Sequence, residues 1–131
     1  YQRRFAAKIG IAEPRPDDRA LIEELLGHMA DRGLDFTNTF AALAETVPEG
    51  LEDWATRWHA RAPDPDLMAG TNPKVIPRTH DIESVITAAL SNDFKSFHAM
   101  LEAVTRPFEP ALAYTAPPTE AEKVHHTFCG T

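Results

Sequence analysis

The residues with the clearest capacity for chemistry lie together near the end of the sequence. His125, His126 and Cys129 fall within five positions. Imidazole nitrogens and thiolate sulfur are good ligands for zinc or copper, so one interpretation is a small metal carrier. A fourth ligand is lacking nearby. The alternative is a tail that happens to hold two histidines and a cysteine.

Cys129 is the only cysteine among the 131 residues, which excludes a disulfide scaffold and a zinc site of four cysteines. A thiol near an exposed terminus can be redox-active, because protonated imidazoles beside it lower its pKa and raise the thiolate fraction. An incidental surface cysteine is the alternative. Both interpretations stay open on the residues alone.

Other candidate residues have simpler structural explanations. His59, His80 and His98 are spread over different predicted helices, which favours boundary or capping roles over that of a catalytic base. Trp54 and Trp58 are one helical turn apart. They could stack a ligand ring, but aromatic residues at this spacing are typical of a helix-packing core.

Sequence motifs of common enzyme classes are absent. The sequence has no glycine-rich phosphate loop, no Gly-x-Ser-x-Gly elbow, no His-Glu-x-x-His motif and no Cys-x-x-Cys motif. The residues alone therefore form no catalytic constellation.

The composition narrows the class of protein. The chain has 13 Lys and Arg against 20 Asp and Glu, a formal net charge of −7. This balance argues against nucleic-acid binding, which depends on Lys and Arg at phosphates. No apolar run is long enough to span a bilayer, so we expect no membrane partner.

Most of the acidic residues in the first half of the sequence lie between Asp17 and Asp66. One alternative function is therefore a stand-alone acidic helical domain that docks a basic partner without catalytic activity.

Apolar residues at helical spacing dominate the sequence and alternating strand patterns are absent, so we predict an all-α fold. Acidic first turns, capping residues, glycines and prolines mark where the helices begin and end. The pattern predicts about five amphipathic helices in an irregular bundle, over residues 17–32, 35–47, 49–62, 79–90 and 92–106.

The remaining segments predict how the chain is organised. Residues 1–10 are typical of the end of a helix already under way, so we expect the chain to be a piece of a longer protein. Residues 62–73 contain three prolines and predict a loop with at most one helical turn, which is the candidate hinge of a single domain over residues 1–131. Residues 107–131 predict an extended, proline-rich C-terminal tail. The predicted core is Leu25, Leu26, Phe36, Phe40, Leu43, Trp54, Trp58, Ile82, Val85, Ile86, Phe97 and Leu101.

Five blocks of residues, in order along the chain, resemble the C-terminal region of the selenoprotein O family. Order and spacing match from about Phe5 to Thr131. The blocks are DFTNTFAAL at 35–43, NPKVIPR at 72–78 leading to NDF at 92–94, LEAVTRPF at 101–108, a Tyr-x-x-Pro-Pro element at 114–118, and FCGT at 128–131.

The resemblance implies more than the residues show. Members of this family have a protein-kinase-like fold, long regarded as a pseudokinase, which binds ATP with magnesium or manganese and transfers AMP to hydroxyl side chains of other proteins. Their nucleotide and metal ligands lie upstream of this region, so the resemblance implies no catalytic, cofactor-binding or metal-binding residue here. The implied partners are the upstream kinase-like domain of the same chain and the protein substrates of the parent. We expect this fragment alone to be inactive.

The resemblance also gives Cys129 a role. Many eukaryotic members have selenocysteine at this position and bacterial members usually have cysteine, which implies a bacterial, cytoplasmic protein. Some members have a second cysteine three residues earlier, where this sequence has His126. A local redox pair is therefore not available. We expect Cys129 to be a regulatory thiol whose disulfide partner lies in the upstream part.

Overall fold

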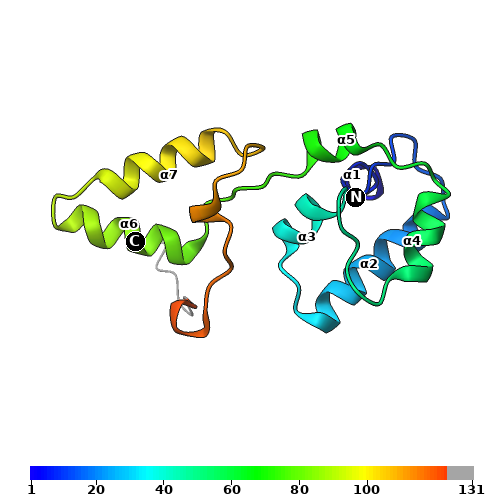
Figure 1. Cartoon of the computed structure of the whole chain (residues 1–131), viewed down its shortest axis with the longest axis horizontal. Coiled ribbons are helices and arrows are strands. Elements are labelled where there is room, and N and C mark those ends of the chain that lie inside the picture. Colours follow the sequence, from blue (N-terminus) through cyan, green and yellow to red (C-terminus); the bar gives the residue numbers. More distant parts are fainter. Residues whose placement is uncertain (124–131) are drawn as a thin grey trace. The chain divides into compact units, whose positions relative to one another are not determined.

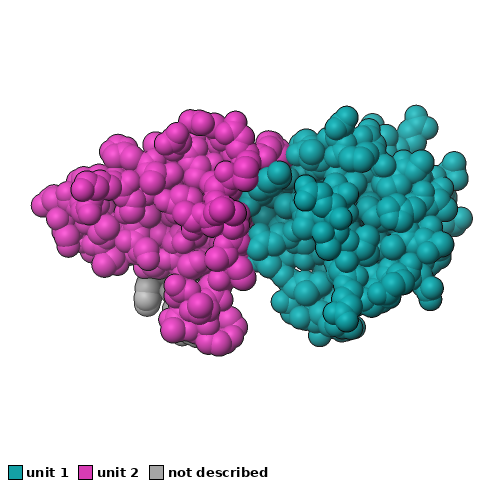
Figure 2. All heavy atoms as spheres, in the orientation of Figure 1, with its two compact units in different colours: residues 1–74 teal, residues 75–131 magenta. Residues whose placement is uncertain are grey.

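The computed structural model describes residues 1–123. Within this range all regular secondary structure is helical, with seven α-helices, two short 3₁₀ turns and no strand. The all-α prediction is confirmed, with seven α-helices in place of about five. The chain divides into two compact units, unit 1 over residues 1–74 and unit 2 over residues 75–131 (Figures 1 and 2). The interpretation of residues 1–131 as one C-terminal domain stays a prediction.

Unit 1 is built from five helices around one hydrophobic core. The helices are α1 (Gln2–Lys8), α2 (Asp18–Arg32), α3 (Phe36–Ala42), α4 (Glu52–His59) and α5 (Pro65–Thr71). Helix α1 contacts α2 and α5, α2 contacts α4, and α3 contacts α5. The buried core consists of Ala6, Ile9, Ile11, Leu21, Ile22, Leu25, Met29, Phe40, Leu43, Leu51, Trp54, Trp58 and Met68.

The helix ends in unit 1 follow the predicted punctuation. Helix α2 ends at Arg32, and Gly33 follows it with the left-handed backbone (φ 62°) that glycine adopts at little cost. The Asp35 side chain caps α3 by accepting a hydrogen bond from the Asn38 backbone N–H at 2.8 Å. Helices α3 and α4 are shorter than predicted, ending at Ala42 and beginning at Glu52.

Helix α5 lies inside the segment that was predicted to be a loop with at most one turn. The Asp64 side chain accepts hydrogen bonds from the backbone N–H groups of Asp66 and Leu67, at 2.9 and 3.2 Å. Pro65 occupies the first turn, where its fixed φ suits a helix and its missing N–H is not needed. Asp-Pro therefore starts a helix here. The helical turn expected around Asp66 to Ala69 extends over Pro65–Thr71, so the prediction of at most one turn was too short.

The two tryptophans pack in the core of unit 1. Their rings stack with centroids 5.2 Å apart. The indole N–H of Trp54 donates to the Leu21 carbonyl at 2.8 Å, and that of Trp58 donates to the Ile9 carbonyl at 2.7 Å. Because both rings are almost fully buried and both N–H groups are satisfied, the tryptophans hold α1, α2 and α4 together and offer no face to a ligand.

Unit 2 contains α6 (Thr79–Leu90) and α7 (Lys95–Thr105), which contact each other, followed by 3₁₀ turns at Leu112–Tyr114 and Glu120–Glu122. The predicted extended tail is thus interrupted by two turns within its described part. The backbone N–H of Val75 donates to the Pro107 carbonyl at 3.1 Å. This hydrogen bond joins the first residue of unit 2 to the segment that follows α7.

The predicted core is only partly correct. Leu25, Phe40, Leu43, Trp54, Trp58 and Val85 are buried, and Leu26 and Ile82 are partly buried. The prediction was wrong for four residues that are between 44% and 47% exposed, namely Phe36, Ile86, Phe97 and Leu101. Helical spacing identifies which side chains share a face, but a face is buried only where another element covers it.

Candidate functional site

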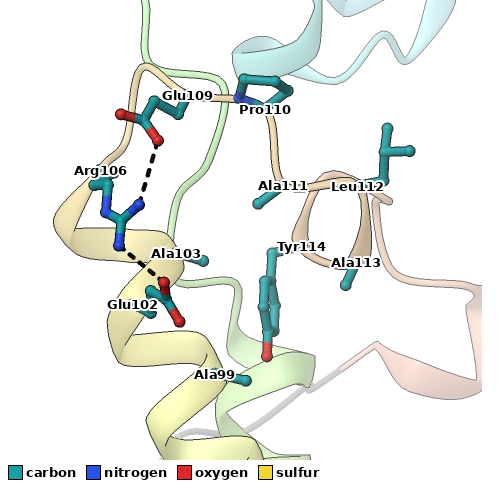
Figure 3. Close-up of a pocket in the computed structure, with 10 residues that line it drawn as sticks. All are labelled: Ala99, Glu102, Ala103, Arg106, Glu109, Pro110, Ala111, Leu112, Ala113 and Tyr114. Carbon is teal, nitrogen blue, oxygen red and sulfur yellow. Dashed lines mark hydrogen bonds and ion pairs between the residues drawn. The ribbon is translucent and has the colours of Figure 1, made fainter.

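One hollow in unit 2 lies between the C-terminal half of α7 and the segment that follows it (Figure 3). Ala99 and Ala103 leave room on α7 because they are one turn apart and have small side chains. The Tyr114 ring lies beside them, from the first 3₁₀ turn. The pocket has a volume of about 300 Å³ and is lined by Ala99, Glu102, Ala103, Arg106, Glu109, Pro110, Ala111, Leu112, Ala113 and Tyr114.

The charges of this pocket are confined to one ion-pair group. Arg106 lies 2.8 Å from a Glu102 oxygen and 3.7 Å from a Glu109 oxygen. All three side chains are more than half exposed, so solvent screens these pairs and they contribute little stability. The rest of the lining is mainly apolar, apart from the Tyr114 hydroxyl. The pocket can therefore accept an apolar side chain.

The residues predicted to form a metal or redox site, His125, His126 and Cys129, lie outside the described residues. The metal-carrier and redox interpretations of these residues stay predictions.

The fold does not bring together the three candidate histidines outside the tail, His59, His80 and His98. His59 is exposed at the end of α4, with its ring against Trp58 at 4.7 Å between centroids. His98 is exposed on α7, in unit 2, beside Phe97. His80 lies in the first turn of α6, 3.5 Å from an Asp81 carboxylate oxygen. Their positions on separate helices agree with boundary roles.

Sequence reasoning missed a polar cluster around Lys8. The Asn72 side chain donates to the Lys8 carbonyl at 2.8 Å and accepts from the Lys8 ammonium at 3.3 Å. The ammonium also lies 5.5 and 5.3 Å from the ring centroids of Phe36 and Phe40. Burial lowers the pKa of Lys8, because a partly desolvated ammonium loses hydration.

This cluster connects two of the sequence blocks. Phe36 and Phe40 belong to the block at 35–43, whereas Asn72 begins the block at 72–78. Both blocks meet at Lys8, so part of their sequence pattern has a structural explanation in unit 1. Asn72 follows the last residue of α5 and is buried, so its amide needs these partners, and the residue pattern alone gave no signal of them.

No family model matches the chain. Similar proteins are nonetheless found over its whole length. The chain is 43% identical to the protein nucleotidyltransferase YdiU of Ruegeria sp. (strain TM1040), 41% identical to that of Ruegeria pomeroyi and 35% identical to that of Rhodopseudomonas palustris. These matches cover 100%, 97% and 100% of this chain. The chain belongs to the selenoprotein O family. It spans only 30–32% of the length of these relatives and is a C-terminal region.

In the described part of this selenoprotein O region, the acidic side chains do not gather into a metal site. Magnesium and manganese take several oxygen ligands from carboxylates and phosphates. Within residues 1–123, no three His, Cys, Asp or Glu side chains converge in a way that could hold an ion. The described part of the chain therefore does not fit the metal that the resemblance implies. No helix in this part is long and apolar enough to cross a membrane.

Proposed function

We propose that this chain is the C-terminal helical region of a protein adenylyltransferase, which transfers AMP from ATP to hydroxyl side chains of other proteins. The observation that carries this proposal is the match over the whole chain to relatives named protein nucleotidyltransferase. The choice of AMP, ATP and protein substrates comes from the resemblance of the five sequence blocks.

The cofactors belong to the remaining part of the protein in this proposal. ATP and Mg²⁺ or Mn²⁺ would be bound by the upstream kinase-like domain, as the resemblance implies. This region would serve that domain as a structural partner. We place the protein in the bacterial cytoplasm, on the basis of the cysteine at the position of the family's selenocysteine.

The test compares the 131-residue chain with the full-length parent under the same conditions. Each is incubated with ATP labelled on the α-phosphate, Mn²⁺ or Mg²⁺ and a hydroxyl-bearing test protein. We expect label on the test protein only with the parent. AMP transfer by the isolated chain, or a parent that transfers no AMP under any of these conditions, would contradict the proposal.

Cys129 is assigned a regulatory role in the same proposal. It would form a disulfide with a cysteine of the upstream part. In this exchange the two protein thiols are oxidised, and a cellular disulfide takes up their two electrons and two protons and is reduced to two thiols. Reductant should then change AMP transfer by the parent, and Cys129→Ala should abolish the response to reductant. If the wild type and Cys129→Ala respond identically, Cys129 has no such role.

A further inference from the structure

Helices α6 and α7 carry large apolar side chains that face solvent. Phe97 and Leu101 lie one turn apart on α7 and are 45% and 47% exposed. Ile86 and Leu90 are spaced in the same way on α6 and are 47% and 84% exposed. Together with Phe94, which precedes α7 and is half exposed, they form what we call the α6–α7 apolar surface.

The described part of unit 2 buries little apolar surface of its own. Its buried hydrophobic residues are Val75, Val85 and Met100. Unit 1, by contrast, has a continuous core of thirteen buried residues. A helical hairpin with so few buried side chains gains little from hydrophobic burial, and exposed apolar residues in such numbers mark an interaction site.

We propose that the α6–α7 apolar surface docks on the part of the same polypeptide that precedes this region. This inference rests on the proposed function, in which the chain is one region of a longer enzyme. The chain spans about 30% of its relatives' length, so more than twice as many residues lie outside it. That remaining part is always present at the same concentration as this surface.

Charge argues against a lipid surface as the occupant. Residues 75–123 contain four Lys and Arg against seven Asp and Glu, a net charge of −3. Anionic membranes attract basic segments, so this unit would be repelled. Unit 1 and a second copy of the chain are the remaining competitors, and the experiments below separate both from the upstream part.

The test measures side-chain accessibility in the full-length parent by hydroxyl-radical labelling and mass spectrometry. Two buried residues of the same types serve as internal references, Phe40 at 2% and Leu43 at 1% exposure. In the parent, we expect Phe97 to be labelled as slowly as Phe40, and Leu101 as slowly as Leu43. In the 131-residue chain, which contains unit 1 but not the upstream part, both should be labelled several-fold faster than these references. Fast labelling of Phe97 and Leu101 in the parent, or equal protection in the 131-residue chain, would overturn the proposal.

The oligomeric state decides between the upstream part and a second copy as the occupant. Sedimentation of the same sample should show that Phe97 and Leu101 are protected in the monomer at every protein concentration. Protection that appears only with dimer formation would identify a second copy as the occupant and overturn the proposal. The labelling does not depend on activity, so an active parent with exposed Phe97 and Leu101 refutes the docking alone. An inactive parent with protected residues refutes the proposed function alone.

A matched pair of variants tests the surface independently. Leu101→Glu in the parent should increase the labelling of Phe97 several-fold, because a charge cannot be buried against an apolar partner. Ala30→Glu is the control, since Ala30 is exposed on α2 and lies outside the surface. Equal effects of the two variants on Phe97 would count against docking.

Discussion

Arg61 reaches back to Asp18 and forms a two-point ion pair across unit 1. Its Nε lies 2.5 Å from Asp18 Oδ1 and its Nη2 lies 2.9 Å from Oδ2. The Asp18 carboxylate is 1% exposed and also accepts from the Arg15 backbone N–H at 2.6 Å. Because the carboxylate is buried, its charge depends on Arg61 in a way that a surface pair does not.

Removal of Arg61 should therefore destabilise the protein strongly. Arg61→Ala leaves the buried Asp18 carboxylate without its cationic partner, so we expect a marked drop in the free energy of unfolding by urea. Arg57→Ala is the control, because Arg57 pairs with Glu24 at 2.7 Å while both side chains are about half exposed. The drop for Arg61→Ala should be roughly several times that for Arg57→Ala. Equal drops would show that burial of Asp18 does not matter.

The same ion pair predicts a pH dependence of stability. The hydrogen bonds from Arg61 hold the pKa of Asp18 below its ordinary value of 3.8. The unfolded chain then binds the proton more readily than the folded chain, so the stabilisation is present above pH 3.8 and lost as the pH falls through the folded-state pKa. Asp18→Asn should thus be much less stable than wild type at pH 7, and the difference should shrink towards pH 3. A constant difference would refute this linkage.

Two glycines should respond in opposite ways to the same substitution. Gly10 has φ +75°, and a Cβ there would lie 2.8 Å from the Asp64 backbone nitrogen, which itself donates to the Gly10 carbonyl. Gly10→Ala should lower the free energy of unfolding by about 2 kcal/mol or more. Gly27 is exposed within α2 and has no neighbour within 4 Å, so Gly27→Ala should raise it by about 0.5–1 kcal/mol. Thermal unfolding of both variants checks the signs.

The Asn72 side chain should contribute more to the stability of unit 1 than the Lys8 ammonium that it contacts. Asn72→Ala leaves the Lys8 carbonyl without its donor and should lower the free energy of unfolding by about 1–3 kcal/mol. Lys8→Met removes only the ammonium, whose charge is already disfavoured by burial, and should have a smaller effect. A larger effect of Lys8→Met in urea unfolding would assign the stabilisation to the cation and the Phe36 and Phe40 rings instead.

The sequence predicted those features of the fold that depend on local chemistry. The Asp35 cap, the glycine end of α2 and the burial of Trp54 and Trp58 all follow from residue type and spacing, and the structure confirms them. The length of helix α5 was underestimated because Pro65 was interpreted as a breaker, although proline directly after a capping aspartate begins a helix.

Features that depend on distant partners could not be predicted in this way. Phe97 and Leu101 share a helix face as expected, but the spacing does not say whether any element covers that face. The Lys8 and Asn72 contacts join residues 64 positions apart, a distance at which residue pattern carries no information. For the candidate site, Cys129 was assigned from family resemblance and stays a prediction.

The two tryptophan hydrogen bonds bear on how the sequence of this region can change during evolution. Each indole donates to a main-chain carbonyl, at Leu21 and at Ile9, and every amino acid supplies such an acceptor. Positions 9 and 21 can therefore exchange one apolar residue for another without loss of the hydrogen bond. Positions 54 and 58 have no such freedom, since phenylalanine would fill much of the space but lose the hydrogen bond from the indole to the main chain. Among divergent homologues, we expect tryptophan at positions 54 and 58, whereas the apolar residues at positions 9 and 21 should vary.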